Sequence, residues 1–321
     1  MRFKWMDTLR GSAILLLLCW HSSSIPFYYY GVRMPEWLFL FNEVFLPWRM
    51  PTLMFMSGML LHRSLSKPLG TYYAGKARSL LWPYVVWGGL HILTWPGFLA
   101  AHHDDFLALA TPSYIWFLAY LILFYLTGPL VAKLPWWVTL PAILLATRIT
   151  VSYEIQDLDY YALFFFAGHY ARPLMGRVTQ ARGWPVALGW IAVAAFTAVS
   201  LWKTHQIGQH YFQSRDIAIP AVLVLIAATA NLASRVTDTV GESAVVRFIQ
   251  WVGRKSIVFY VVHFPVMRLV ADPLADRLGV WVIPVCYVVA LSVGIILALG
   301  SDKMPLSLLF RAPSRSKRDR A

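Results

Sequence analysis

The stretch Leu9–Pro26 has the sequence LRGSAILLLLCWHSSSIP, which is mostly apolar and nearly long enough to cross a lipid bilayer as a helix. A membrane-spanning helix needs about 20 consecutive, mostly apolar residues. Two ionisable side chains stand inside this stretch, Arg10 near its start and His21 nearer its end. Because ionisable groups inside a membrane span are energetically costly and commonly functional, the stretch predicts both a fold class and a functional site.

The composition of the whole chain is that of an integral membrane protein. Of the 321 residues, 59% are hydrophobic and 13% are charged, and the mean hydropathy is +0.58. Soluble domains carry about 25% charged and about 45–50% apolar residues. Helices satisfy their own backbone hydrogen bonds within lipid, so the expected fold class is all-α, a polytopic helical bundle in the membrane.

Ten apolar segments are candidate membrane-spanning helices. They lie near residues 9–30, 44–62, 79–100, 114–132, 136–152, 158–173, 185–202, 216–234, 255–272 and 279–300. We expect residues 1–310 to form a single transmembrane domain. The remaining residues, 311–321, have the polar and basic sequence RAPSRSKRDRA, which predicts a disordered cytoplasmic tail.

The distribution of basic residues predicts the orientation of the chain. If the N-terminus is cytoplasmic and the ten spans alternate, 21 of the 28 Lys and Arg residues fall in cytoplasmic segments. Basic residues in short loops favour the cytoplasmic side, so we expect both termini to be cytoplasmic. The same rule accounts for the net charge of +13, and no nucleic-acid partner is expected.

Arg10 and His21 are predicted to share one face of the first helix. They are eleven residues apart, which is about 16 Å along a helix. Eleven steps of about 100° end about 20° past three full turns. A cation at the cytoplasmic mouth and a titratable ring at mid-depth describe a path for a long ligand with an anionic head. In the simpler alternative, Arg10 only anchors the helix and His21 hydrogen-bonds a neighbouring helix.

A second histidine, His263, is predicted to lie at a similar depth. It stands in VGRKSIVFYVVHFPV, eight residues after Lys255, which marks the cytoplasmic edge. Ser256 precedes His263 by seven residues and lies on nearly the same helix face. His263 is either a second catalytic group or a helix-packing partner, and the sequence leaves both roles open.

Lys76 and Arg78 form a further basic cluster where the third span begins. Such a pair is ordinarily an interfacial anchor. Together with Arg10, however, it could hold phosphate groups, which arginine grips in a bidentate fork.

The second span contains Arg49 and the pair Ser57-Gly58. An arginine inside a membrane should have a carboxylate or carbonyl partner, and Glu43 is one candidate on the same helix. Small residues such as Ser57-Gly58 permit close helix approach. A direct chemical role for these residues is the less favoured alternative.

No metal site and no bound cofactor are expected. Cys19 and Cys286 both lie in apolar runs, where cysteine is ordinarily a small core residue. The sequence HHDD at residues 102–105 falls in a predicted outer loop. Adjacent residues point in different directions and their spacing matches no known metal site, so we expect a solvated loop.

Six stretches of the chain, in order, resemble the motifs of acyltransferase family three, the integral-membrane acyltransferases that modify sugars. The stretches are MDTLRGSAILLLLCWHS, FLPWRMPTLMFMSGMLL, KARSLLWPYVVWG, PSYIWFLAYLILFYL, YYALFFFAGHYA and VGRKSIVFYVVHFPV. Two positions depart from the usual pattern: Gly75 stands where the family commonly has an arginine, and Arg49 stands where it often has a histidine.

The resemblance implies transfer of an acyl group, most simply acetyl, from cytoplasmic acyl-CoA to a hydroxyl of a glycan or lipid-linked sugar. It also implies a location in the cell membrane (plasma or inner membrane), with acyl-CoA as a co-substrate. A histidine could deprotonate the acceptor or carry the acyl group itself. The residues expected at the site are His21 and His263 for catalysis, Arg10, Lys76 and Arg78 for acyl-CoA, and Arg49, Ser57 and Trp116 for the substrate pocket.

Two other functions are compatible with the same residues. A transporter or flippase for an anionic or sugar-bearing lipid would also place histidine and arginine inside the membrane. A structural partner subunit would tolerate the loss of His21. Release of free CoA thiol from acyl-CoA in the presence of an acceptor distinguishes the acyltransferase from both.

Overall fold

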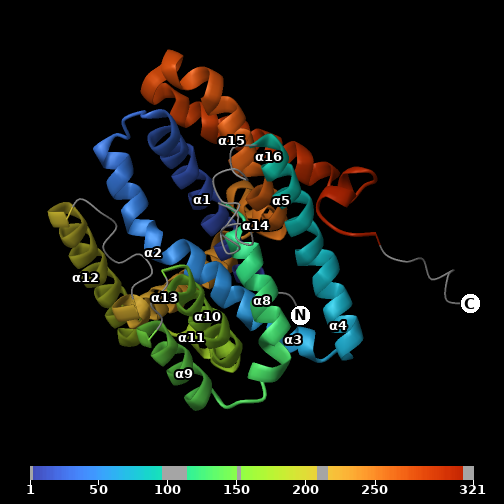
Figure 1. Ribbon diagram of the computed structural model, residues 1–321. Coiled ribbons are helices and arrows are strands. Elements are labelled where there is room, and N and C mark those ends of the chain that lie inside the picture. The colour runs from blue at the N-terminus through green and yellow to red at the C-terminus, as the bar shows by residue number, and fades with distance from the viewer. Residues whose placement is uncertain (1–2, 96–113, 150–152, 208–215, 314–321) are drawn as a thin grey trace, which may run out of the picture.

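The protein is a helical bundle throughout the described part of the chain (Figure 1). The structure is a computed structural model that describes residues 3–95, 114–149, 153–207 and 216–313. Within these ranges the regular secondary structure is helical and no strand occurs. The all-α fold class predicted from the sequence is therefore confirmed.

Each of the ten predicted apolar segments overlaps a helix. These helices are α1 (Lys4–Tyr30), α2 (Glu36–Met59), α5 (Trp82–Thr94), α8 (Trp116–Val131), α9 (Trp136–Ile149), α10 (Tyr153–Ala171), α12 (Trp184–Ile207), α13 (Ile219–Val240), α15 (Ser256–Leu278) and α16 (Val282–Gly300). The sequence thus located the long helices, with ends that differ by up to about eight residues.

Several of these helices fit a membrane by length and composition. Among the described residues, four stretches are long and apolar enough to span: Glu36–Leu65, Trp184–Gln206, Ile219–Val240 and Ser256–Gly300. The apolar helices α8 and α9 are shorter. α1 is less apolar because it carries Arg10, His21 and a run of serines. The number of membrane crossings, about ten, and the side on which the termini lie stay predictions.

Short helical elements fill the connections. From α2 the chain passes through α3 (Leu61–Leu65), α4 (Leu69–Lys76) and η1 (Ala77–Leu81) into α5, and η1 is a π-helical turn. The other short elements are η2 (Arg172–Leu174), α11 (Met175–Gln180), η3 (Asp216–Ala218), α14 (Ala244–Arg254), η4 (Gly279–Trp281) and η5 (Leu306–Leu309). Turns of the π type are frequent at functional sites, and η1 borders the site described below.

α1 is the central helix of the bundle, in contact with α2, α13, α14, α15 and α16. Glycine allows its neighbour α14 to approach closely, since a Cβ on Gly11 would collide with the backbone carbonyl of Ile249. α2 meets α10 in the same way, because a Cβ on Gly58 would collide with the Phe165 carbonyl. The close approach predicted for the Ser57-Gly58 pair is therefore present.

Contacts between connections place several predicted cytoplasmic segments together at one end of the bundle. The Lys255 Nζ atom lies 2.6 Å from the Asp302 carboxylate, which links the start of α15 to the segment after α16. Arg235 donates a hydrogen bond of 2.7 Å to the carbonyl of Ala181, which links α13 to the segment after α11. We call this the Arg10 end of the bundle, after the arginine near the start of α1.

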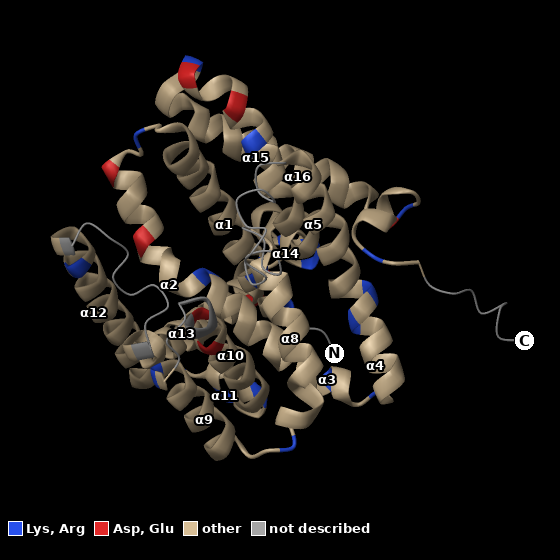
Figure 2. Ribbon diagram, viewed as in Figure 1, with Lys and Arg blue, Asp and Glu red and all other residues tan. Residues whose placement is uncertain are grey.

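The opposite end of the bundle is defined by the last turn of α1. There the Tyr30 hydroxyl lies 3.4 Å from the Asp272 carboxylate of α15. Acidic residues occur at this end on α2 and on the C-terminal part of α15 (Figure 2). We call it the Tyr30 end. The predicted loop at 102–105 and most of the predicted tail, residues 314–321, lie outside the described residues.

Candidate active site

A cavity of about 190 Å³, the Arg10 cavity, opens between α1, α2, η1, α8 and α15. It contains two cations, Arg10 and Lys76, and its described lining residues include no acid. A pocket with charge of one sign concentrates ligands of the other sign. The polar side chains in its walls are Arg10, Ser57, Lys76, Ser79, Tyr125, Ser256 and Tyr260.

Lys76 is held in this cavity by an aromatic ring. Its Nζ atom lies 3.2 Å from the centre of the Tyr125 ring. The Tyr125 hydroxyl in turn donates a hydrogen bond of 2.7 Å to the backbone carbonyl of Ser57, which fixes the ring. Burial, with a smaller contribution from the charge of Lys67, lowers the pKa of Lys76 to about 7. An anion bound in the cavity would supply the negative charge that favours the protonated form of the lysine.

A second cavity of about 110 Å³, the His21 cavity, lies further along α1. It is enclosed by α1, α2, α10, α15 and the residues that precede and begin α8. The polar and aromatic side chains in its walls are Trp20, His21, Arg49, Tyr114, Trp116, Tyr160, Tyr161 and Tyr260.

Arg49 enters the His21 cavity from α2, between Pro47 and Pro51. It is 2% exposed, and its Nη1 atom donates a hydrogen bond of 3.2 Å to the Leu16 carbonyl on α1. The expected partner Glu43 instead accepts a hydrogen bond of 3.2 Å from Thr204. The hydrogen-bond partner of this arginine is thus a backbone carbonyl, the second of the two kinds of partner expected from the sequence.

Two polar atoms in the walls of the His21 cavity have no hydrogen-bond partner among the described residues. They are Arg49 Nε and the Tyr160 hydroxyl, both buried. Buried polar groups are almost always hydrogen-bonded in native proteins. Unpartnered donors that face a shared cavity therefore indicate a site for a polar ligand.

His21 and His263 form a pair, with ring centres 5.0 Å apart. His263 Nδ1 lies 2.6 Å from the backbone carbonyl oxygen of Tyr260. A carbonyl only accepts hydrogen bonds, so Nδ1 carries the proton and Nε2 carries the lone pair in the neutral ring. That Nε2 atom is buried and has no hydrogen-bond partner among the described residues.

The Arg10 and His21 cavities meet at Tyr260, which lines both. On α1, Arg10 lines the first cavity and His21 the second, as their shared helix face predicted. α15 runs alongside, with Ser256 in the first cavity and His263 behind the second. The two cavities therefore follow one another along a pair of adjacent helices.

Most of the residues predicted for the site come together in this way. Arg10, Lys76 and Ser57 line the first cavity, His21, Arg49 and Trp116 line the second, and the His263 ring lies tilted against that of His21. Arg78 lies apart from both cavities: its Nε and Nη2 atoms donate to the carbonyl of Ala312, at 3.3 and 3.2 Å.

Three tyrosines belong to the site and were not assigned to it from the sequence. Tyr160 presents a hydroxyl without a partner among the described residues, and Tyr260 lines both cavities. The Tyr260 hydroxyl donates a hydrogen bond to the backbone carbonyl of Tyr114. Tyrosine is common in apolar helices, so no signal in the chain distinguishes these three from the other tyrosines. Their positions in the quoted motifs PSYIWFLAYLILFYL, YYALFFFAGHYA and VGRKSIVFYVVHFPV were the available indication.

The fold and the site define a class: a helical membrane-type bundle in which a cavity that contains a pair of adjacent histidines adjoins a cation-lined cavity. Among the described residues, no group of three potential metal ligands comes together. The expectation of no metal and no bound cofactor stays a prediction.

Comparison with known protein families identifies the chain. Residues 3–299 match the acyltransferase domain of acyltransferase family 3, which is nearly the whole chain. The protein therefore belongs to this family, and it is an acyltransferase. No curated protein and no solved structure gives a significant match to the chain.

Proposed function

We propose that the protein transfers an acyl group, most simply acetyl, from cytoplasmic acyl-CoA to a hydroxyl of a glycan or lipid-linked sugar. The reaction would take place within the cell membrane, plasma or inner, which the chain crosses several times. One observation carries the proposal: a cation-lined cavity adjoins a cavity that contains His21, and Tyr260 lines both.

The donor enters at the Arg10 end. The phosphate groups of acyl-CoA remain at the mouth, where Arg10 and Lys76 supply charge-assisted hydrogen bonds. The remainder of the Arg10 cavity is mostly apolar, with residues such as Ile14, Leu53 and Leu121 in its walls. That lining suits the pantetheine arm, which brings the thioester past Tyr260 towards His21. Acyl-CoA acts as a co-substrate, and no bound cofactor takes part.

His21 acts as the general base on the acceptor. It takes the proton of the acceptor hydroxyl as the oxygen attacks the thioester carbonyl carbon. A carbon–oxygen bond forms, the carbon–sulfur bond breaks, and the CoA thiolate leaves. The proton then passes from His21 to the thiolate, which yields the ester, free CoA thiol and the original enzyme.

Arg49 and Tyr160 stabilise the negative charge that develops on the carbonyl oxygen. Both present a buried donor without a partner among the described residues of the His21 cavity wall. Donors that are fixed before the reaction and directed at a developing oxyanion are a large source of catalysis. The Leu16 carbonyl and the ring of Trp20, 5.3 Å away, hold the Arg49 guanidinium in place.

His263 supports His21 as a second proton-carrying group. Its Nδ1 atom is tied to the Tyr260 carbonyl, so the ring cannot turn without losing that bond. Two imidazolium rings 5.0 Å apart would repel each other in a low-dielectric interior, so the pair accommodates a single added proton. The proton that His21 removes from the acceptor is therefore held within the pair until the thiolate leaves.

The test combines thiol release with analysis of cell-surface glycans. The purified protein should release CoA thiol from acetyl-CoA when acceptor is present, and cells without the protein should lose an ester from a surface glycan. Protein with His21→Gln should restore neither, whereas protein with the exposed control His62→Gln should restore both. Acceptor movement across the membrane without thiol release would instead establish the transporter.

A further inference from the structure

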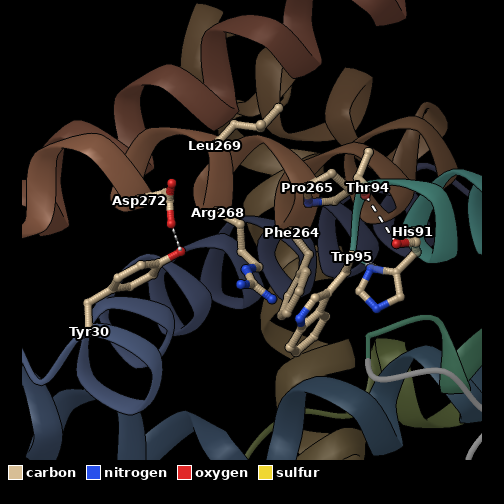
Figure 3. A pocket seen from close by; sticks show the side chains of 9 residues that line it. All are labelled: Tyr30, His91, Thr94, Trp95, Phe264, Pro265, Arg268, Leu269 and Asp272. Carbon is tan, nitrogen blue, oxygen red and sulfur yellow. Dashed lines mark hydrogen bonds between the residues drawn. The ribbon is translucent and has the colours of Figure 1, made fainter. Parts of the chain in front are cut away.

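A third cavity lies at the Tyr30 end of the bundle, and the reaction steps above do not use it. Its volume is about 200 Å³, and it lies between the end of α1, the end of α5 and the middle of α15 (Figure 3). Its chemically distinctive lining residues are Tyr30, His91, Trp95, Phe264, Arg268 and Asp272. The mixture of aromatic rings, an arginine and a carboxylate differs from the lining of the Arg10 cavity.

Arg268 is the cation of this cavity, and aromatic rings hold its guanidinium. Its Cζ atom lies 3.9 Å from the centre of the Trp95 ring and 4.8 Å from that of Tyr29. In Figure 3 the guanidinium extends from α15 towards Trp95 and Phe264. The Nη1 atom is buried and has no hydrogen-bond partner among the described residues. The rings cover the faces of the guanidinium, which also interacts with the Tyr30 hydroxyl, and Nη1 is left for a ligand.

The Asp272 carboxylate does not hydrogen-bond the Arg268 Nη1 atom. It stands four residues after Arg268 on α15, a spacing at which opposite charges commonly pair. Instead its carboxylate accepts a hydrogen bond from the Tyr30 hydroxyl at 3.4 Å (Figure 3). Its remaining lone pairs are acceptors of the kind that bind sugar hydroxyl groups.

One layer of aromatic side chains separates the third cavity from His21. The Phe264 ring lines the third cavity and stacks on Tyr114, with ring centres 4.8 Å apart. Tyr114 lines the His21 cavity, and the Phe264 ring centre is 5.9 Å from that of His21. The third cavity is thus the nearest described cavity to His21 on the side away from the donor.

We propose that the third cavity binds the acceptor and selects an acceptor sugar that carries a negative charge, a carboxylate or a phosphate. This inference rests on the proposed acyl transfer. The Nη1 edge of Arg268 binds the anionic group, because guanidinium binds planar carboxylate and phosphate oxygens in a bidentate manner. The Trp95 ring provides an apolar surface for the sugar ring, and Asp272 accepts a hydrogen bond from a sugar hydroxyl.

Ligand-dependent thermal stability of the full-length protein in lipid nanodiscs, without acyl-CoA, tests the site. The probes are methyl glucuronide, glucose 6-phosphate, the neutral methyl glucoside, and glycerol 3-phosphate. At saturation the two charged sugars should raise the midpoint of unfolding by on the order of 2 °C, and the neutral sugar by less than half as much. Equal shifts for charged and neutral sugars would overturn the proposal.

Substitution of Arg268 provides the second readout. Arg268→Gln should abolish the difference between methyl glucuronide and methyl glucoside, and Arg277→Gln, at an exposed site on the same helix, should preserve it. Arg268→Lys keeps the positive charge but loses the two parallel N–H donors of the guanidinium, and it replaces the glutamine variant if that variant does not fold. In Arg268→Lys the difference between methyl glucuronide and methyl glucoside should shrink. A difference that survives at full size in these variants would contradict the assignment.

Two further outcomes are informative. One distinguishes a charged sugar from a lipid headgroup, and the other distinguishes failure of the anion site from failure of the proposed acyl transfer. A shift with glycerol 3-phosphate equal to that with glucose 6-phosphate would overturn the assignment of the ligand as a sugar and would favour a lipid headgroup. Binding of charged sugars that depends on Arg268, in a protein that never releases CoA thiol, would support the anion site and refute acyl transfer.

Discussion

The cavities on the two sides of His21 present positive charge in different ways. The Arg10 cavity places two cations in a largely apolar passage, with Lys76 above the Tyr125 ring. The third cavity places one arginine among aromatic rings, with the Asp272 carboxylate beside it. The first arrangement suits several phosphate groups followed by a long apolar arm, and the second suits one anionic group on a ring rich in hydroxyls.

In the proposed reaction, this difference would let one histidine serve two substrates. His21 stands between the two cavities, and each cavity reaches it through a different aromatic residue, Tyr260 on the donor side and Phe264 on the other. Under the proposed reaction, separate residues would therefore supply the binding energy for the donor and for the acceptor. Substitution of His21 should affect turnover, and substitutions in the Arg10 cavity or the third cavity should each affect the Michaelis constant of one substrate.

The largest expected effect is at the middle, at His21. General-base catalysis typically contributes about 10²–10⁴-fold, so His21→Ala should lower kcat by roughly that factor. His21→Gln should fall similarly, because an amide hydrogen-bonds but does not accept the proton. Steady-state kinetics of thiol release measure both variants. Near-normal turnover in the glutamine variant would show that His21 is a structural residue and not the general base.

Removal of the donor-side cations should raise the KM for acyl-CoA. Each charge-assisted hydrogen bond contributes about 1.5–3 kcal/mol, which corresponds to about 10–100-fold in affinity. The double variant Arg10→Gln with Lys76→Gln should therefore raise this KM by at least about tenfold, while the KM for the acceptor changes little. Arg63→Gln, an exposed arginine in the same predicted cytoplasmic region, is the control. An unchanged acyl-CoA KM would remove both residues from the donor site.

The smallest expected effect is on the pH dependence of donor binding. Because the pKa of Lys76 is about 7, the free protein loses this charge as the pH rises through 7. Affinity for acyl-CoA should then fall between pH 7 and 8.5 by no more than about tenfold, the contribution of this one charge, since binding favours the protonated lysine. Lys76→Arg should flatten this dependence between pH 7 and 8.5. An equal slope in both proteins would show that another group titrates.

The sequence predicted the long helices and the central face of the site because both depend on local periodicity. Arg10 and His21 share a face over three turns, and the structure places them in adjoining cavities. Lys76 and Arg78 could not both enter the same cavity, because residues two apart lie on nearly opposite helix faces. The helical rule itself could therefore have separated Arg78 from the site.

The third cavity could not be predicted because it depends on contacts between distant segments. Trp95, at the end of α5, and Arg268, in α15, meet only after the bundle has formed. The same applies to Glu43, whose carboxylate accepts a hydrogen bond from Thr204 on the distant helix α12. Periodicity assigns a residue to a face, but it does not say which other helix that face meets.

The central claim is that the donor and the acceptor reach His21 from opposite ends of the bundle. Proteoliposomes that contain the protein in one orientation test it directly, with acyl-CoA on one side of the membrane and acceptor on the other. We predict ester formation, and thiol release on the side of the N-terminus, only when acyl-CoA is on that side and the acceptor is opposite. Transfer that requires both substrates on the same side would contradict the account.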